Sequence, residues 1–238
     1  MIRLLLRTFG GEGWDRLPML RACLLRHFGD ISAVRLGRRH PLSIVLLYLQ
    51  DKDVIEGALE QAFLVLLDTL EKKLTPADNE IHFLRVDLCF LLRERQNYTT
   101  AERYGLRFLT ETERIHGRSH VATRGFLLKV GDIYLHQKLY EQAIQVFNDV
   151  LDRSNDALGT DLDITGLYAH RNLGWIYEEL KHDMTSEYHW KAVVGGALRI
   201  WGVGTEKFMY FAAQARESMC RQGFNTGVWM KLNFAIDE

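Results

Sequence analysis

The amino-acid sequence predicts an all-α protein, a solenoid of stacked antiparallel helix pairs, and three observations support this fold class. Small residues return along the chain in fixed columns with one long period. Breaks that contain glycine or proline return with the same period. Between the breaks, apolar residues recur at steps of three and four, the spacing of one helix face, and no segment sustains two-residue alternation, so we expect no β-sheet.

Two columns of small residues define a repeat of 39–43 residues. The first column, at steps of 40, 39, 42 and 43 residues, consists of Ala22, Ala62, Ala101, Ala143 and Ser186. The second column lies twelve residues ahead of the last three members and consists of Cys89, Gly131 and Gly174. Apolar residues directly precede the second column, and Leu92, Tyr134 and Tyr177 follow it by three residues. Columns that stay in phase over three repeats indicate a true internal repeat.

The breaks between segments keep the same period. They are Leu36-Gly37 with His40-Pro41, Thr75-Pro76, His116-Gly117, Leu158-Gly159 and Trp201-Gly202. Glycine just after a helix supplies the left-handed residue that ends it, and proline fits the first turn of the next helix. The breaks therefore mark the boundaries between repeats.

Between the breaks we expect two helices in each unit. They are a leading helix near 17–36, the pairs 41–52 with 55–73, 79–94 with 98–115, 119–136 with 140–156 and 162–180 with 184–200, and a weaker pair after 205. The pair Gly195-Gly196 is expected to interrupt the helix at 184–200. A repeat domain then spans 17–222, made of a half repeat at 17–36, repeats at about 37–76, 77–117, 118–159 and 160–202, and a degenerate repeat at 203–222. A flexible segment (1–16) precedes the domain and a cap or tail (223–238) follows it.

The small columns have a physical reason. Where glycine, cysteine or alanine lies at a helix crossing, two helix axes can approach to the near end of the usual range of about 8–10 Å. The aromatic residues then fill the space between one repeat and the next. A single helix pair cannot bury its apolar face alone, whereas stacked pairs form a continuous core.

Composition excludes several classes of function. The 30 basic and 31 acidic residues leave a formal charge of −1, which argues against a nucleic-acid partner. Cys23, Cys89 and Cys220 lie far apart, as expected for reduced thiols of an intracellular protein. The apolar runs are too short to span a membrane, and no signal peptide is visible. We therefore expect a location in the cytoplasm or nucleus.

The segment 1–40 contains eight Arg and no Lys. Two interpretations remain open for this stretch, a mitochondrial transit peptide and the solvated face of a helix. The second fits the acidic residues that interrupt the stretch and its continuation into the repeat pattern.

Motifs for chemistry are weak. His116 and His120 have the four-residue spacing of helical metal ligands, but Gly117 and Ser119 lie between them at a break. The segment Gly202–Gly204 lacks the glycine spacing of a phosphate-binding loop. No nucleophile elbow or zinc-protease helix occurs, so we expect no metal, no cofactor and no enzymatic activity.

The column pattern resembles the tetratricopeptide repeat (TPR) family. The fullest match is Val130-Gly131 with Tyr134, Tyr140, Ala143 and Phe147, and the next is Leu173-Gly174 with Tyr177 and Trp190. The units are longer than the standard repeat of that family, which has about 34 residues. Longer units, with breaks such as Leu158-Gly159 through Thr165, look like the kinesin-light-chain subtype and like arrays in fungal regulatory proteins. The resemblance covers about 17–222 and implies a right-handed superhelix that binds other proteins.

The resemblance also implies where a partner binds. In this family the first helix of each pair lines the concave face, and an Asn two residues before the small column often holds the backbone of a bound peptide. Asn172 matches that position, which Asp87 and Lys129 occupy in the other repeats. The expected partner-binding residues are Lys129, Asp132, His136, Tyr168, Arg171, Asn172, Trp175 and Glu178. Phe83, Phe90 and Arg93 lie on the same face, where aromatic rings also serve as packing between repeats.

Three functional hypotheses follow from these patterns. The first is an adaptor or scaffold that binds a protein or peptide partner in the groove. The second is a structural or regulatory array that forms a homo-oligomer or packs on another domain through its end repeats. This hypothesis rests on the start of the chain, which we expect to begin halfway through a repeat, as a fragment of a longer array would. A half repeat is expected to expose the apolar residues Leu20, Leu24, Leu25 and Ile31. The third is an enzyme whose site carries no recognisable motif.

Overall fold

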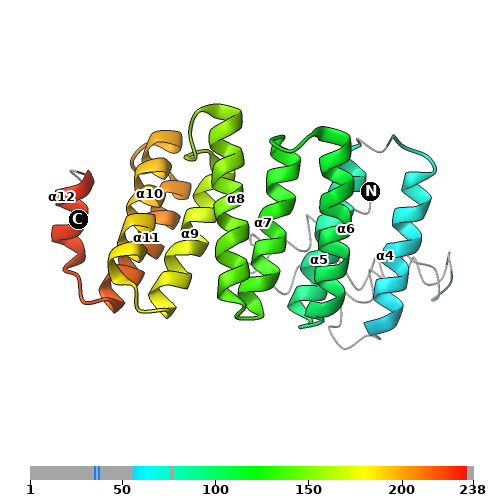
Figure 1. The fold of residues 1–238 in the computed structure, drawn as a ribbon, viewed down its shortest axis with the longest axis horizontal. Helices are drawn as coiled ribbons and strands as arrows, with labels where there is room; N and C mark the ends of the chain where they lie inside the picture. Colours follow the sequence, from blue (N-terminus) through cyan, green and yellow to red (C-terminus); the bar gives the residue numbers. More distant parts are fainter. Residues whose placement is uncertain (1–34, 36, 38–55, 76–77, 235–238) are drawn as a thin grey trace. The chain divides into compact units, whose positions relative to one another are not determined.

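The structure is a computed structural model that describes residues 35, 37, 56–75 and 78–234. Its described residues form nine α-helices and no strand (Figure 1). The helices are α4 (Glu56–Glu71), α5 (Asn79–Glu94), α6 (Tyr98–His116), α7 (Val121–His136), α8 (Tyr140–Leu158), α9 (Ile164–Glu179), α10 (Asp183–Trp201), α11 (Glu206–Arg221) and α12 (Thr226–Phe234). The chain divides into two units, residues 1–97 and 98–238.

The helix pairs expected from the sequence are confirmed wherever the structure describes them. The range 79–94 matches α5, and the ranges 140–156 and 184–200 differ from α8 and α10 by at most two residues at each end. The expected helices at 17–36 and 41–52 lie outside the described residues, apart from Arg35, which is helical. The segments 1–16 and 235–238 also lie outside them.

The expected interruption at Gly195-Gly196 is wrong, because α10 continues through both residues to Trp201. Gly196 is buried, and a Cβ atom added there would lie 3.1 Å from Cδ2 of Leu167 on α9. Glycine costs a helix about 1 kcal/mol relative to alanine. The packing that the missing side chain permits offsets this cost, so the helix persists.

Polar side chains begin three of the helices. Nδ1 of His120 accepts a hydrogen bond from the backbone N–H of Ala122 at the start of α7. Oδ1 of Asp163 accepts one from Gly166 at the start of α9, at 2.9 Å. Thr205 plays the same part at the start of α11. These caps satisfy N–H groups that the helix itself leaves without acceptors.

The tight turn inside each repeat places one residue in the left-handed region. The residues with positive φ at these turns are Gln96, Lys138, Lys181 and Gly223. Their spacing along the chain matches that of the small columns, so the turn recurs with the period of the repeat. Residues 206–234 therefore repeat the helix–turn–helix geometry of the preceding units, with α12 as the second helix of the last pair.

Within the second unit, each helix packs against the next one along the chain from α6 to α12. Helix α7 also contacts α9, the first helix of the following repeat. Figure 1 shows α6 to α12 following one another in chain order. This arrangement is the stacking of helix pairs that a solenoid requires.

The core of this unit is built around two contacts between a glycine and an aromatic ring. A Cβ atom at Gly131 on α7 would lie only 2.5 Å from a ring carbon of Phe147 on α8. A Cβ atom at Gly174 on α9 would lie 2.9 Å from Nε1 of Trp190 on α10. Both aromatic side chains are fully buried. The small column therefore marks the positions where the two helices of a pair touch.

Polar bonds tie each repeat to its neighbour. Pairs separated by 39–43 residues include Arg124–Asp163, Arg153–Glu113, Asn172–Asp132, Arg221–Glu178 and Trp229–Glu187. Because their separation equals the repeat length, each joins nearly equivalent places in adjacent repeats. The buried polar groups thus bond between repeats as well as within them.

We predict that Gly131→Ala destabilises the protein, although alanine is the better helix former. The new methyl group would meet the ring of Phe147, and overpacking of this kind costs about 1–3 kcal/mol. The matched control is Gly125→Ala on the same helix, where an added Cβ meets nothing within 4 Å. The control should gain up to about 1 kcal/mol from helix propensity. Urea unfolding followed by circular dichroism measures both, and equal stability of the two variants would contradict the packing argument.

Candidate partner-binding face

The eight residues expected to bind a partner lie on two helices that contact each other. Lys129, Asp132 and His136 are on α7, and the other five, Tyr168, Arg171, Asn172, Trp175 and Glu178, are on α9. Steps of three and four residues place most of them on one side of each helix. Seven of the eight form one connected set of contacts, and Glu178 belongs to a second set.

Arg171 is held between two aromatic rings of its own helix. Its guanidinium carbon lies 4.8 Å from the ring centre of Tyr168 and 4.7 Å from that of Trp175. The two rings come from positions i−3 and i+4, which face the same side of a helix as Arg171. The side chain is half-buried, and within the part of the chain that the structure describes it forms no ion pair with a carboxylate. The charge is therefore oriented but not neutralised.

A hydrogen-bonded chain leads from Arg171 to the neighbouring repeat. Its Nε and Nη2 atoms donate to Oδ1 of Asn172, at 3.3 and 3.1 Å. Nδ2 of Asn172 donates in turn to Oδ1 of Asp132 at 2.7 Å. Nζ of Lys129 lies 3.4 Å from the other oxygen of Asp132. The chain joins α9 to α7, and the neutral amide of Asn172 lies between the guanidinium and the carboxylate.

Asn172 and Asp132 are the interior part of this chain, with exposed fractions of 1% and 8%. Both ends of the Asn172 amide are bonded within the protein. Arg171 and Lys129 are more exposed, and they carry the network towards the surface. The buried amide of Asn172 thus holds the guanidinium of Arg171 from the interior, and Arg171 is the more exposed of the two.

His136 and the two aromatic residues complete the set. Nδ1 of His136 lies 2.7 Å from the backbone oxygen of Asp132, so this nitrogen carries a proton and donates it. Tyr168 packs edge-on against Phe211, and Trp175 packs edge-on against Trp190. Each ring therefore has one side in the core and another beside Arg171. Packing between helices and display on the face are combined in the same side chains.

In the first unit, α5 carries a similar pairing of arginine and aromatic ring. The guanidinium of Arg93 lies 4.7 Å from the ring centre of Phe90, whose side chain is 45% exposed. Phe83 is partly buried and packs edge-on against His82. The three residues expected on this face of the repeat, Phe83, Phe90 and Arg93, thus all lie on α5.

No protein family model and no curated protein sequence matches the chain. A solved structure that does match is the crystal structure of BtubC (BKLC) from P. vanneervenii, a TPR protein of the kinesin light chain type. The TM-score is 0.60 over 85% of this chain and 83% of BtubC, with 11% sequence identity. The fold is a TPR-like α-solenoid. Identity this low carries the fold alone, and it does not separate one TPR subtype from another.

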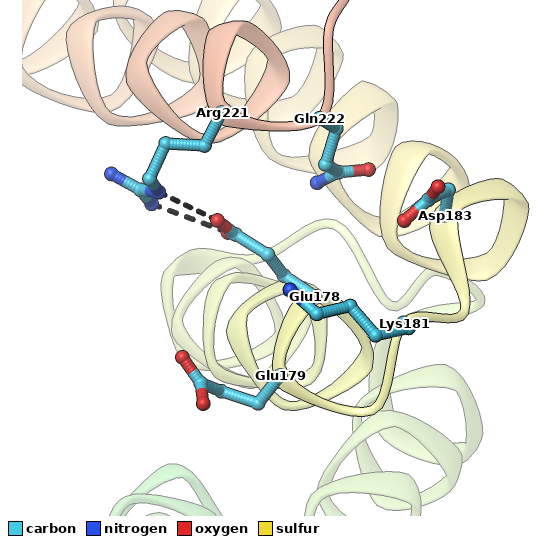
Figure 2. A pocket seen from close by; sticks show the side chains of 6 residues that line it. All are labelled: Glu178, Glu179, Lys181, Asp183, Arg221 and Gln222. Carbon is cyan, nitrogen blue, oxygen red and sulfur yellow. Dashed lines mark hydrogen bonds and ion pairs between the residues drawn. The ribbon is translucent and has the colours of Figure 1, made fainter.

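Glu178 lies at the edge of a polar pocket at the ends of α9 and α11. Figure 2 shows Arg221 of α11 reaching across to Glu178 of α9. Nε of Arg221 lies 2.6 Å from Oε1 of Glu178, and the hydroxyl of Ser218 donates to Oε2. Burial alone would raise the pKa of Glu178, but the bonds from Arg221 and Ser218 outweigh it and lower that pKa.

The pocket has a volume of about 550 Å³. It is lined by Glu178, Glu179, Lys181, Asp183, Arg221 and Gln222. The acidic and basic side chains of the pocket largely balance. Glu178 and Arg221 already form an ion pair with each other. Glu178 therefore acts in this structure as a tie between neighbouring repeats rather than as part of the Arg171 network.

The histidines considered as metal ligands have other roles. The rings of His116 and His120 stack at 4.8 Å, and His120 caps α7. Burial and the neighbouring His120 lower the pKa of His116. Within the described ranges no group of three or more His, Cys, Asp or Glu side chains is placed to hold a metal ion. None of the described helices is both long and apolar enough to cross a membrane.

One cluster of functional groups escaped the sequence reasoning. His170 on α9 and His189 on α10 are both buried, and their Nδ1 atoms lie 2.8 Å apart. Oδ2 of Asp161 lies 3.3 Å from Nε2 of His170. The two histidines are 19 residues apart on different helices, so no spacing rule for a single helix could find them.

We predict that Asn172→Ala lowers stability, because the buried Asp132 then loses its amide donor. A hydrogen bond to a charged group contributes about 1.5–3 kcal/mol. Asn148→Ala on α8 is the matched control, since Asn148 is exposed and surface changes usually stay within about 0.5 kcal/mol. The free energy of unfolding in urea distinguishes the two variants. Equal values would mean that the Asn172–Asp132 bond contributes nothing to the joint between the repeats.

Proposed function

We propose that the protein is a non-enzymatic interaction module, an adaptor, that binds an extended segment of a partner protein along the face formed by α7 and α9. The TPR-like fold supports a role in protein interaction. The observation that carries the proposal is the oriented, unneutralised Arg171 between Tyr168 and Trp175. In this proposal a carboxylate of the partner binds Arg171.

The geometry around Arg171 suits a carboxylate. Asn172 engages the Nε and Nη2 atoms, and the planar guanidinium offers further N–H donors in a fixed fork. Arginine pairs with carboxylates through two parallel hydrogen bonds, which gives direction as well as energy. A side chain that is already positioned by two rings loses little conformational freedom on binding.

The composition of the face fits an energetic centre of binding. Tryptophan, tyrosine and arginine are the residues that contribute most at protein interfaces, and one of each lies within about two turns of α9. Lys129 supplies a second positive group on α7, with a side chain 35% exposed.

An extended segment is the occupant we favour, since it can pass successive first helices and contact each repeat in turn. We place the interaction inside the cell, in the cytoplasm or nucleus, with no nucleic-acid or membrane partner. The alternative of self-association rests on Leu20, Leu24, Leu25 and Ile31, which lie outside the described residues.

We predict that Arg171→Glu reverses the charge at the centre of the face and releases the partners. Affinity capture from cell lysate, read by quantitative mass spectrometry, should show loss of a set of proteins relative to the unaltered chain. Losing a charge-assisted pair and adding repulsion costs more than about 1.4 kcal/mol, so affinity should fall at least about tenfold. The matched control is Arg114→Glu, an exposed arginine on α6 away from the face.

The decisive step is a charge exchange. A captured partner whose acidic residue is changed to lysine should lose affinity for the unaltered chain and regain it for Arg171→Glu. Circular dichroism must show that the variants remain folded. Partners kept equally by Arg171→Glu and Arg114→Glu would place the interaction elsewhere on the molecule.

A further inference from the structure

The joint between α9 and α10 contains a buried chain of three titratable groups. His170 and His189 have exposed fractions of 1% and 6%, and their Nδ1 atoms share a hydrogen bond of 2.8 Å. Nε2 of His170 lies 3.3 Å from a carboxylate oxygen of Asp161, in the loop before α9. Neither histidine takes part in the binding face described above, so their arrangement calls for its own explanation.

The hydrogen bonds determine where the protons lie. The carboxylate of Asp161 accepts, so Nε2 of His170 carries a proton, and in neutral His170 the other nitrogen is bare. Nδ1 of His189 must then donate to Nδ1 of His170. With one proton more, the two rings still share a single hydrogen bond, which either ring can donate. A second additional proton sets two N–H groups against each other at 2.8 Å and abolishes the bond.

Aromatic rings and one carboxylate surround the two imidazoles. The ring of Tyr177 stacks on His189 from α9, and Tyr188 on α10 meets both imidazoles edge-on. Exposed His182 stacks on the far side of the joint, against Tyr177. Asp161 is the charged group that favours protonation, and Arg199 holds its loop by donating to the backbone oxygen of Leu162 at 2.7 Å.

Burial disfavours the charged form of both histidines. It lowers the pKa of His170 below 6.5, against the opposing effect of Asp161. Burial, followed by the positive charge of a neighbouring His170, lowers the pKa of His189 to about 3. The folded joint therefore holds fewer protons than an opened one in mildly acidic solution.

We propose that Asp161, His170 and His189 form a proton-sensitive latch that keeps α9 and α10 together while the two imidazoles share a hydrogen bond and releases them when both are protonated. The latch joins the two helices of one repeat, and its His170 lies on the helix that carries Arg171 and Asn172. Its chemistry is proton uptake alone and requires no ligand.

The direction of the pH dependence follows from the lowered pKa values. The stabilising contribution of the latch is complete above the ordinary histidine pKa of 6.5 and is lost as pH falls below it. Each histidine whose pKa is lowered favours the opened state up to about tenfold for every pH unit below 6.5, until its folded-state pKa is reached. For His189 this window extends from 6.5 down to about 3.

Opening the latch has a consequence that rests on the proposed function. His170 directly precedes Arg171 and Asn172, so loosening α9 from α10 disturbs the position of the guanidinium. Acidification should then weaken partner binding. The latch itself is tested without any partner, so its failure and the failure of the proposed binding function can be told apart.

We predict that His189→Asn flattens the acid dependence of stability. An asparagine amide can still donate to His170, but it cannot take up a proton. Urea unfolding of the full chain between pH 8 and 5 should show that the unaltered protein takes up about one proton more on unfolding than His189→Asn does. The control His182→Gln removes an exposed histidine beside the latch and should retain the steep profile.

Nitrogen-15 NMR of the unaltered protein gives a second test that needs no variant to fold. At pH 7, His189 should be protonated at Nδ1 and His170 at Nε2, and neither should titrate with an ordinary pKa while the protein stays folded. Parallel unfolding profiles for the unaltered protein and His189→Asn would overturn the proposal. So would titration of both rings near pH 6.5 in the folded state.

Discussion

The contact between a glycine and an aromatic ring, repeated in successive helix pairs, is the constraint on which the structure depends. At Gly131 and at Gly174 there is no space for even one more carbon, because Phe147 and Trp190 occupy it. The contact brings the axes of the two helices close and fixes which face of each is buried. In α9, Tyr168, Arg171 and Trp175 lie beside this buried contact, and each of the three is only partly buried.

Apolar packing of this kind positions the two helices of one pair against each other. The polar bonds between repeats supply the register. A buried carboxylate or guanidinium depends on its partners, so a shift of one turn would break the bonds that Arg124, Asp132 and Arg153 make to the neighbouring repeat. Because the separation of these pairs equals the repeat length, each pair aligns the two neighbouring repeats that it joins.

Most of this fold could be predicted because its signals are local and periodic. Glycine after a helix and the three- and four-residue apolar steps located the ends of α5 to α10 to within two residues. The predicted interruption at Gly195-Gly196 was wrong because helix propensity describes an isolated helix. In the folded protein, Gly196 lies in close contact with Leu167, and this packing keeps the helix intact. The sequence placed Arg171 and Trp175 on one face, but it could not show that Asn172 is buried under Asp132. His170 and His189 meet across two helices, and no local pattern reports such a meeting.

These constraints converge on α9. Its Gly174 touches Trp190, its Asn172 bonds to Asp132 on α7, its His170 bonds to His189 on α10, and its Glu178 bonds to Arg221 on α11. A helix tied to three others moves only if several ties yield together, which gives Arg171 a fixed direction. Among these ties, the histidine pair is the one whose groups ordinarily change charge between neutral and mildly acidic pH, since carboxylate and guanidinium keep their charges there. In the proposed latch, acidification therefore acts on α9 first at its joint with α10.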